Sequence, residues 1–195
     1  MRNRFLLALT LAGLTLAAGT SAQAQTSSWT IDPNHSSIGF EIRHMGVSNV
    51  RGSIGGVKGT VTLNDKDITK SSVDATVDTT TVTTNVDARD KHLKSPDFFD
   101  VAKYPQITFK STSLTNNGGK LQLTGDLTLT GTTKSVTLDL DGPAPPQTGK
   151  DGKTRSGFSA TGALKRSDFN FGPKFGSAMV GDDVKFTIDV EIDKQ

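Results

Sequence analysis

Apolar and polar residues alternate with a period of two along most of this chain. Residues 38–42, 73–77, 136–140 and 184–192 are clear examples, because every second position in each of them is apolar. This period places successive side chains on opposite faces of a β-strand. The pattern as a whole predicts about eight or nine strands, each with one dry face and one solvated face.

Turn-forming residues separate these segments and favour an antiparallel order with short connections. They occur at residues 64–67, 116–119 and 131–133, and a longer loop rich in Pro and Gly runs from Asp141 to Ser156. Antiparallel strands with a single dry face form either a sandwich of two sheets or a closed barrel. We favour an all-β barrel, because the glycines within residues 52–56 can bend a strand and closure removes unpaired edges.

One segment rich in charge and phenylalanine interrupts the strands. Residues 87–94 predict a short helix, which Pro96 prevents from continuing. Phe98 and Phe99 follow directly, and a second Phe-rich stretch occupies residues 168–175. Physical grounds alone favour a plug whose phenylalanines cover one end of the barrel, with the second stretch serving as a strand end and a flexible lip.

The beginning of the chain has the features of a secretory signal peptide. Two arginines precede an apolar run over residues 5–18, and small residues at 22–24 supply a cleavage site. The apolar run is shorter than the ~20 residues of a membrane span. We therefore expect a signal peptide over residues 1–24 and one soluble, periplasmic domain over residues 25–195.

The mature chain is expected to be neutral, which makes nucleic acid an unfavourable partner. Of the 22 Lys and Arg residues, Arg2 and Arg4 lie in the predicted signal peptide, which leaves 20 against 20 Asp and Glu residues. Binding to nucleic acid depends on clustered Lys and Arg that neutralise phosphates, and the sequence has no such cluster. The chain also contains no Cys, so the fold must depend on its core and its hydrogen-bonded strands.

The sequence offers little support for catalysis or for a bound metal. It has no Cys and no Gly-x-Ser-x-Gly motif, and His92 and Asp97 are its only candidates for acid–base chemistry. The histidines His35, His44 and His92 are widely spaced, so a metal site would require tertiary convergence. We predict neither an enzyme nor a metal site.

Several ordered motifs are distributed over the whole mature chain. They are Trp29-Thr30-Ile31-Asp32-Pro33 with His35-Ser36, Arg89-Asp90-x-His92-Leu93-x-Ser95-x-Asp97-Phe98-Phe99-Asp100, Tyr104-Pro105-x-Ile107-x-Phe109, the run from Gly125 to Leu138, and the run from Gly157 to Phe169. Together they resemble the YceI-like family of secreted lipid-binding proteins. The resemblance implies an extended, eight-stranded antiparallel β-barrel of lipocalin-like shape, with an apolar tunnel for polyisoprenoid chains or other long amphiphiles. It also implies a periplasmic location, frequent homodimers and, in some members, a response to stress.

Strand parity and the plug argument select the side chains that should point into such a tunnel. The expected tunnel residues are Ile38, Phe40, Ile42, Phe98, Phe99, Ile107, Phe109, Phe158, Phe169 and Phe171. Ala75, Ala160 and Gly162 lie on otherwise apolar faces, where a filled core would require larger side chains. These small residues favour a cavity over a packed interior.

Arg89, His92 and His44 are the candidates for contact with a polar head group. Guanidinium and imidazolium groups form charge-assisted hydrogen bonds with phosphate oxygens, so these residues suit a phosphorylated ligand. For a neutral ligand they would be solvated surface charges, and the residues alone favour that simpler interpretation.

We therefore predict a periplasmic carrier or store for a polyisoprenoid, quinone or fatty-acid-like lipid, with no reaction and no cofactor of its own. A strand rises ~3.3 Å per residue, so tilted strands of roughly ten residues would enclose a tunnel about 25 Å long. The resemblance adds the expectation of a homodimer. The alternative is a barrel with a filled core, in which Phe98, Phe99 and Phe175 bind a protein partner.

Overall fold

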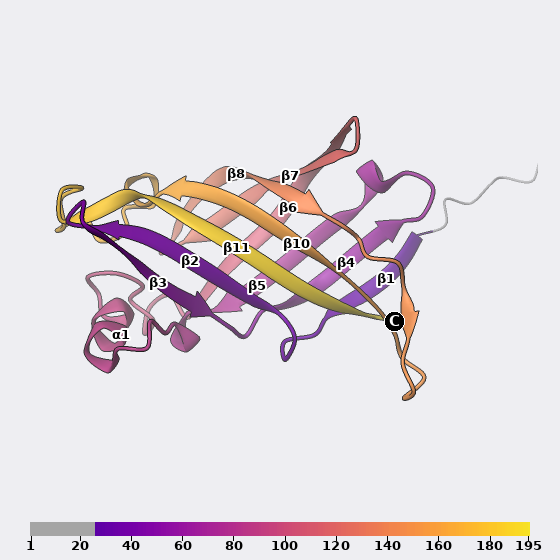
Figure 1. Cartoon of the computed structure of the whole chain (residues 1–195), viewed down its shortest axis with the longest axis horizontal. Coiled ribbons are helices and arrows are strands. Elements are labelled where there is room, and N and C mark those ends of the chain that lie inside the picture. The colour runs from indigo at the N-terminus through magenta and orange to yellow at the C-terminus, as the bar shows by residue number, and fades with distance from the viewer. Residues whose placement is uncertain (1–25) are drawn as a thin grey trace, which may run out of the picture.

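The alternating segments form strands that close into a barrel. The computed structural model describes residues 26–195, so the predicted signal peptide and its cleavage site lie outside the described residues. Eight strands form an antiparallel ring in the order β11, β1, β4, β5, β6, β7, β8 and β10, and β10 closes it by pairing with β11 (Figure 1). Their bounds are β1 Thr26–Ile31, β4 Lys58–Asn64, β5 Ser72–Asp78, β6 Gln106–Asn117, β7 Lys120–Leu129, β8 Thr132–Asp141, β10 Thr154–Lys165 and β11 Val180–Lys194. The predicted eight-stranded barrel is confirmed.

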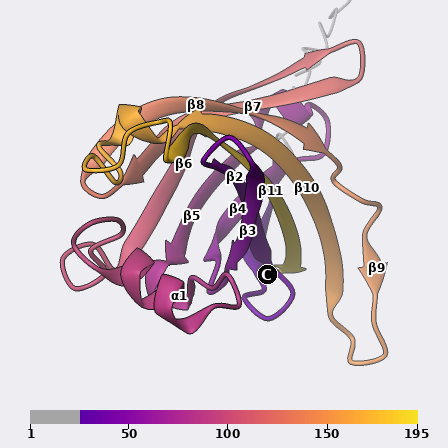
Figure 2. The same ribbon diagram turned by 60° about the vertical axis from the view of Figure 1, so that its left-hand side comes forward.

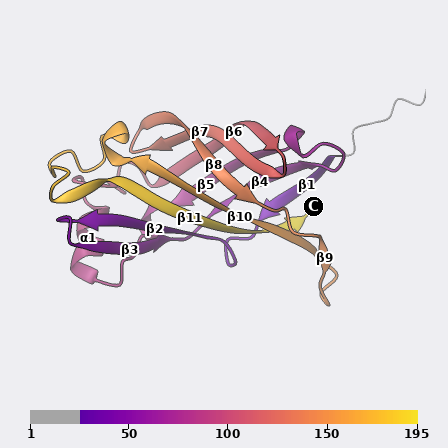
Figure 3. The same ribbon diagram turned by 45° about the horizontal axis from the view of Figure 1, so that its top comes forward.

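A further hairpin extends the barrel at one end. It consists of β2, Ser37–His44, and β3, Ser48–Ile54. Because β11 is 15 residues long, it accommodates two strands on one edge: β1 pairs with its residues 192–194, and β2 with its residues 180–189. The tip of the β2–β3 hairpin therefore lies at the same end of the barrel as the helix α1 (Figures 1 and 3).

The predicted helix is present with the predicted bounds. α1, Asp87–Lys94, lies across one end of the barrel (Figure 2), and its last turn carries three basic side chains that complement the helix dipole. Ser95 has an extended backbone, which the following Pro96 favours, and its N–H donates to the carbonyl oxygen of His92. These two residues end the helix and direct the chain toward Phe98 and Phe99.

The Phe-rich stretch over residues 168–175 does not continue a strand, so that part of the prediction is wrong. β10 ends at Lys165, and η3, Arg166–Phe169, follows as a 3₁₀ turn. Asn170 then adopts a left-handed backbone with φ of 52°, a conformation that Asn tolerates better than most residues. The chain therefore leaves the wall of the barrel and crosses the same end as α1.

The remaining elements are short. The 3₁₀ turns η1, Ile68–Lys70, and η2, Thr79–Thr81, flank β5. The long loop after β8 contains β9, Gln147–Thr148, which pairs with the beginning of β10 and projects from the barrel as an arm (Figure 2). No helix within residues 26–195 is long and apolar enough to cross a membrane.

The end of the barrel opposite α1 is filled with side chains. Trp29 pairs with Val61 on β4, and Ile31 pairs with Ile192 on β11; each of these four residues is at most 2% exposed. They share one parity, so all four point inward from neighbouring strands. This layer packs the interior between β1, β4 and β11, away from α1.

Candidate functional site

The interior of the barrel contains a cavity of about 430 Å³, within the range of small-molecule sites. Nearly all of the residues that line this cavity are aliphatic or aromatic, and most strands of the barrel contribute to the lining. The apolar lining includes Ile38, Phe40, Ile42, Val73, Ala75, Phe98, Phe99, Ile107, Phe109, Leu127, Leu138, Phe158, Ala160, Phe171, Phe186 and Ile188. Ala75 and Ala160, two of the three small residues that favoured a cavity, lie on its lining, whereas Gly162 does not.

Nine of the ten residues expected in the tunnel line this cavity, and Phe169 is the exception. Phe169 lies in η3 and is 1% exposed, packed within the hydrophobic core rather than against the hollow. Its placement was inferred from strand alternation, which ends at Lys165 where the backbone turns. The side chain of Phe169 therefore packs in the hydrophobic core and does not line the cavity.

Glycines on neighbouring strands allow three phenylalanine rings to lie close against the wall. A Cβ atom on Gly162 would come within 2.6 Å of Phe186, and one on Gly52 or Gly125 would come within 2.4 Å of Phe40 or Phe109. Such distances are far shorter than van der Waals contact, so any larger residue would push the ring toward the centre of the barrel. The glycines thus keep the space between the walls open.

Aromatic side chains from two distant segments meet at the α1 end of the cavity. Phe99 lies edge to face with Phe171, with ring centroids 4.7 Å apart, and Phe98 is stacked on Phe175. The imidazole of His92 lies edge-on against both Phe98 and Phe175, with centroids 5.1 and 5.6 Å away. The predicted plug and the predicted lip are therefore one aromatic cluster, which forms the mouth of the cavity.

A polar chain holds the two sides of this mouth together. His92 Nε2 lies 3.1 Å from Asp97 Oδ2, and Lys174 Nζ donates to Asp97 Oδ1 at 2.6 Å. These bonds, that from Lys174 first, hold the pKa of the Asp97 carboxyl below its ordinary value. Asp97 thus joins His92 of α1 to Lys174, an arrangement that suits structural support better than acid–base chemistry.

Arg89 lies on the cavity lining, and its guanidinium is partly engaged by the protein. Its Nε donates to the hydroxyl of Thr84 at 2.7 Å, and one terminal nitrogen donates to the Thr84 carbonyl at 3.1 Å. Asp90 accepts from the Thr84 hydroxyl and backbone N–H and from the Thr83 hydroxyl, which lowers the pKa of its carboxyl. The loop before α1 is therefore tied to the first turns of the helix, and Arg89 is positioned by this tie.

Arg166 is a cavity residue that sequence reasoning missed. It is only 4% exposed, and its guanidinium donates to the carbonyl oxygens of five residues: Phe171, Gly172, Phe175, Val180 and Gly181. A buried guanidinium needs such a set of acceptors. These bonds hold the segment after η3 in a defined loop. The only sequence signal for Arg166 was its position directly after a strand.

The polar side chains on the cavity lining are all basic. They are Arg43, His44, Arg89, His92 and Arg166, and no Asp or Glu among the described residues lines the cavity. Each of the three head-group candidates is therefore brought to one end of one cavity, although His44 comes from β2 and the other two from α1. The arrangement can orient an amphiphile whose polar end accepts hydrogen bonds.

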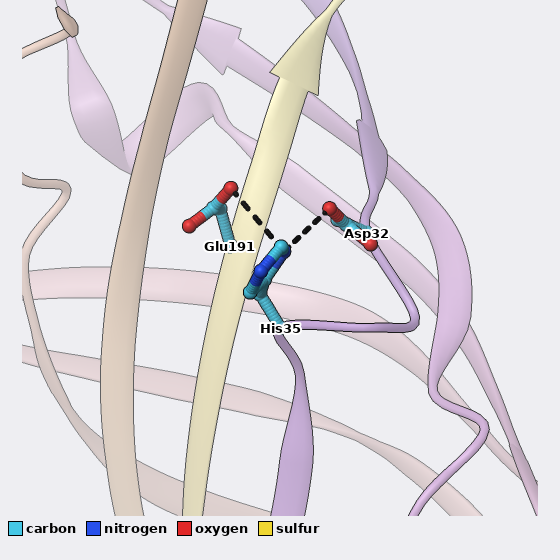
Figure 4. A group of neighbouring side chains, drawn as sticks. All are labelled: Asp32, His35 and Glu191. Carbon is cyan, nitrogen blue, oxygen red and sulfur yellow. Dashed lines mark hydrogen bonds and ion pairs between the residues drawn. The ribbon is translucent and has the colours of Figure 1, made fainter.

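A second group of titratable side chains lies away from this cavity. His35 Nδ1 is 2.8 Å from Asp32 Oδ2 and 3.7 Å from Glu191 Oε1 (Figure 4). The hydrogen bond to Asp32 raises the pKa of His35, and the same bond lowers the pKa of Asp32. These three residues could hold a cation, but Arg155 Nε lies 3.3 Å from the same Glu191 oxygen and already supplies positive charge there.

Comparison with known proteins gives a consistent result. The YceI-like domain matches residues 29–192. Protein YceI of Escherichia coli O6:H1 is 43% identical over 193 residues, covering 97% of each chain. The crystal structure of the Campylobacter jejuni YceI protein has 33% identity and a TM-score of 0.70, covering 79% of this chain and 90% of that one.

A more distant neighbour shows how widely the fold is used. The structure of a polyisoprenoid binding domain from Saccharophagus degradans has a TM-score of 0.63 at 12% identity, covering 87% of this chain and 99% of that one. At that identity the likeness concerns the fold alone. The family match and the E. coli relative cover the barrel from β1 to β11, and the chain therefore belongs to the YceI-like family.

Proposed function

We propose that this protein binds a long amphiphilic lipid in the barrel and serves as a periplasmic carrier or store for it. The observation that carries the proposal is the cavity, which is apolar along its walls and basic at one end. A polyisoprenoid, a quinone with an isoprenoid tail and a fatty-acid-like lipid all share this pattern of a long tail and one polar end. The polyisoprenoid binding domain with the same fold favours the first of these classes.

The energetics of tail burial support this proposal. At ~0.3 kcal/mol per non-hydrogen atom, each ten carbon atoms of tail that contact the wall would contribute about 3 kcal/mol to binding. Contact between the tail and the wall can therefore supply most of the affinity. The basic residues at the mouth would then determine orientation and selectivity.

The proposed orientation places the polar head at the α1 end. Trp29, Val61 and Ile192 are buried in the core away from α1, and a tail that enters from the mouth would extend toward this layer. Arg89, His92 and His44 line the mouth, and their donors would face the head group. The phenylalanines Phe98 and Phe171 would contact the first carbons of the tail.

The proposal contains no reaction. The only acid–base candidates, His92 and Asp97, are bonded to each other, and Asp97 is also bonded to Lys174. We propose a carrier without a cofactor, whose signal peptide would direct it to the periplasm.

Lipid extraction of the purified protein, followed by mass spectrometry, tests this function. We expect one co-purifying class of long-chain lipid in amounts close to one molecule per barrel, and uptake of an added prenyl alcohol after delipidation. The matched control is Ala160→Phe, which would fill the cavity from its wall. A protein without lipid that also fails to take up prenyl and fatty chains would favour the alternative, a filled barrel that binds a protein partner.

A further inference from the structure

Three large apolar side chains are exposed at the tips of two loops beside the mouth of the cavity. Met45 and Val47 lie in the hairpin tip, residues 43–51, and are 61% and 78% exposed. Met179 lies in the lip, residues 170–181, and is 54% exposed. The two loops touch, because the backbone N–H of Met45 donates to the carbonyl oxygen of Met179 at 2.9 Å.

Met45 is exposed at a position where its own conformation is unfavourable. It has φ of 51° and precedes Gly46 at φ of 68°, and the N–H of Val47 donates to the carbonyl of His44. Three residues, 45–47, separate the paired His44 and Ser48, and the two central residues of the turn have positive φ, as in the type I′ turns that strongly prefer Asn-Gly. At 61% exposure, the side chain of Met45 gains little from packing that would offset the cost of its left-handed backbone.

The loops that carry these side chains are held in place by the protein. Arg166 donates to the carbonyls of Val180 and Gly181, directly after Met179, and to the carbonyl of Phe175 within the lip. The two loops lie at the α1 end of the barrel (Figures 1 and 3), and through His44 and Met179 they contribute to the lining of the cavity.

The charged side chains within the two tips are basic. Residues 43–51 and 170–181 include Arg43, His44, Arg51 and Lys174 and contain no Asp or Glu, whereas Asp182 and Asp183 follow directly and bond to Ser167 and Lys165. Arg51 and Lys174 are paired with the carboxylates of Glu41 and Asp97 from outside the tips. Arg43 bonds to neutral acceptors, the carbonyl of Gly46 and the side-chain oxygen of Asn49, so its charge is not neutralised by these contacts.

We propose that this end of the barrel docks on the surface of an anionic phospholipid bilayer, with Met45, Val47 and Met179 inserted among the acyl chains. Apolar side chains rimmed by cations are the pattern of interfacial membrane binding. Anionic lipids attract such basic residues near the surface. Docking in this orientation directs the mouth of the cavity at the bilayer, and in this respect the inference rests on the proposed function as a lipid carrier.

A bilayer suits this surface better than a second copy of the chain. A symmetric dimer through the tips would bring Arg43 and His44 of one copy close to the same residues of the other. A stable protein interface also buries about 800 Å² per partner and involves roughly 20–30 residues, whereas three separate protruding side chains offer much less. A fluid bilayer needs no matching shape.

Sedimentation with vesicles of phosphatidylcholine containing roughly 30% phosphatidylglycerol tests the docking. We expect the protein to bind these vesicles, and expect the double variant Val47→Ser with Met179→Ser to bind on the order of tenfold or more weakly. Met45→Asn should also weaken binding while making the hairpin more stable, since Asn suits the turn. A loss of binding in that variant therefore cannot be attributed to unfolding.

Val86→Ser is the matched control, because Val86 is 45% exposed but lies next to the segment that pairs with Ser53, away from the hairpin tip. Its binding to vesicles should be unchanged. Equal binding by the wild type and the tip variants, or no binding by either, would overturn the docking proposal. Sedimentation velocity measures the oligomeric state of the same variants. A wild-type dimer that the tip substitutions convert to monomers would assign these side chains to a contact with a second copy, and would also overturn the docking proposal.

Lipid content, measured by extraction of the same samples, separates this inference from the proposed function. Tip variants that retain co-purified lipid but lose vesicle binding support docking as a separate property. Wild-type protein that binds vesicles through its tips but contains and takes up no lipid would support docking while overturning the carrier.

Discussion

The rings of Phe98 and Phe175 are stacked in parallel at the mouth of the cavity, with centroids 5.0 Å apart and planes that differ by 5°. One ring follows α1 and the other lies in the lip before β11, so the stack joins two segments that are distant in sequence. Both rings line the cavity at the end where its basic side chains lie. The stack is thus a candidate gate as well as a source of stability.

Removal of one ring of the stack should speed the release of bound lipid. Aromatic pairs contribute ~0.5–1.5 kcal/mol beyond their buried area, so Phe175→Ala should raise the release rate of a fluorescent prenyl analogue about three- to tenfold. Phe175→Leu keeps an apolar cover and should have a smaller effect. Unchanged release rates in both variants would show that the lipid does not pass between these rings.

Gly162→Ala should reduce the length of chain that the barrel accepts. The new Cβ would lie within 2.6 Å of Phe186, so the ring must move toward the centre of the cavity. Mass spectrometry of the bound lipid should show a shift toward shorter chains or a lower occupancy. Gly55→Ala is the matched control, since its Cβ would have no neighbour nearer than 3.9 Å, and it should bind the same lipids as the wild type.

Arg166→Met should destabilise the protein strongly. It removes one donor from each of five backbone carbonyls, of which Gly172 still accepts from the N–H of Phe175, and each buried group left unsatisfied costs ~1–3 kcal/mol unless water reaches it. We expect the free energy of unfolding, measured with urea, to fall by roughly 3 kcal/mol or more. Arg51→Met, at a side chain that is 71% exposed, should change it by less than about 0.5 kcal/mol. A small effect at Arg166 would mean that the lip is organised without it.

The His35–Asp32 pair should be most stabilising at mildly acidic pH. The pKa of His35 is raised from 6.5, so its contribution to stability is complete below pH 6.5 and is lost as the pH rises through the higher folded value. The pKa of Asp32 is lowered from 3.8, so its contribution is present above pH 3.8 and is lost as the pH falls through the lower folded value. NMR titration of the His35 ring checks this directly. In Asp32→Asn the pKa of His35 should fall toward 6.5, and an unchanged value would exclude the hydrogen bond as its cause.

The period-two pattern by itself determined the strands, the all-β class and most of the cavity wall. Phe40, Ile107 and Phe158 could be assigned to the interior because parity holds along an unbroken strand, and each of them lines the cavity. The helix was predictable for a similar local reason, since Pro96 acts on its immediate neighbours. Barrel closure was favoured from the glycines and the edge argument, and the pairing of β10 with β11 confirms it.

Tertiary structure alone decided the features that depend on contacts between distant segments. Parity is lost where β10 turns into η3, so Phe169 was wrongly placed in the tunnel. The position of Arg166 directly after a strand did not reveal its role, because its acceptors lie on a loop whose path only the folded chain defines. The stacking of Phe98 on Phe175 and the contact between His35 and Glu191 likewise depend on the folded barrel. Each joins two segments that are distant in the sequence. A repeating pattern reports which way a side chain faces within its own strand, whereas its partners are determined by the packing of the whole chain.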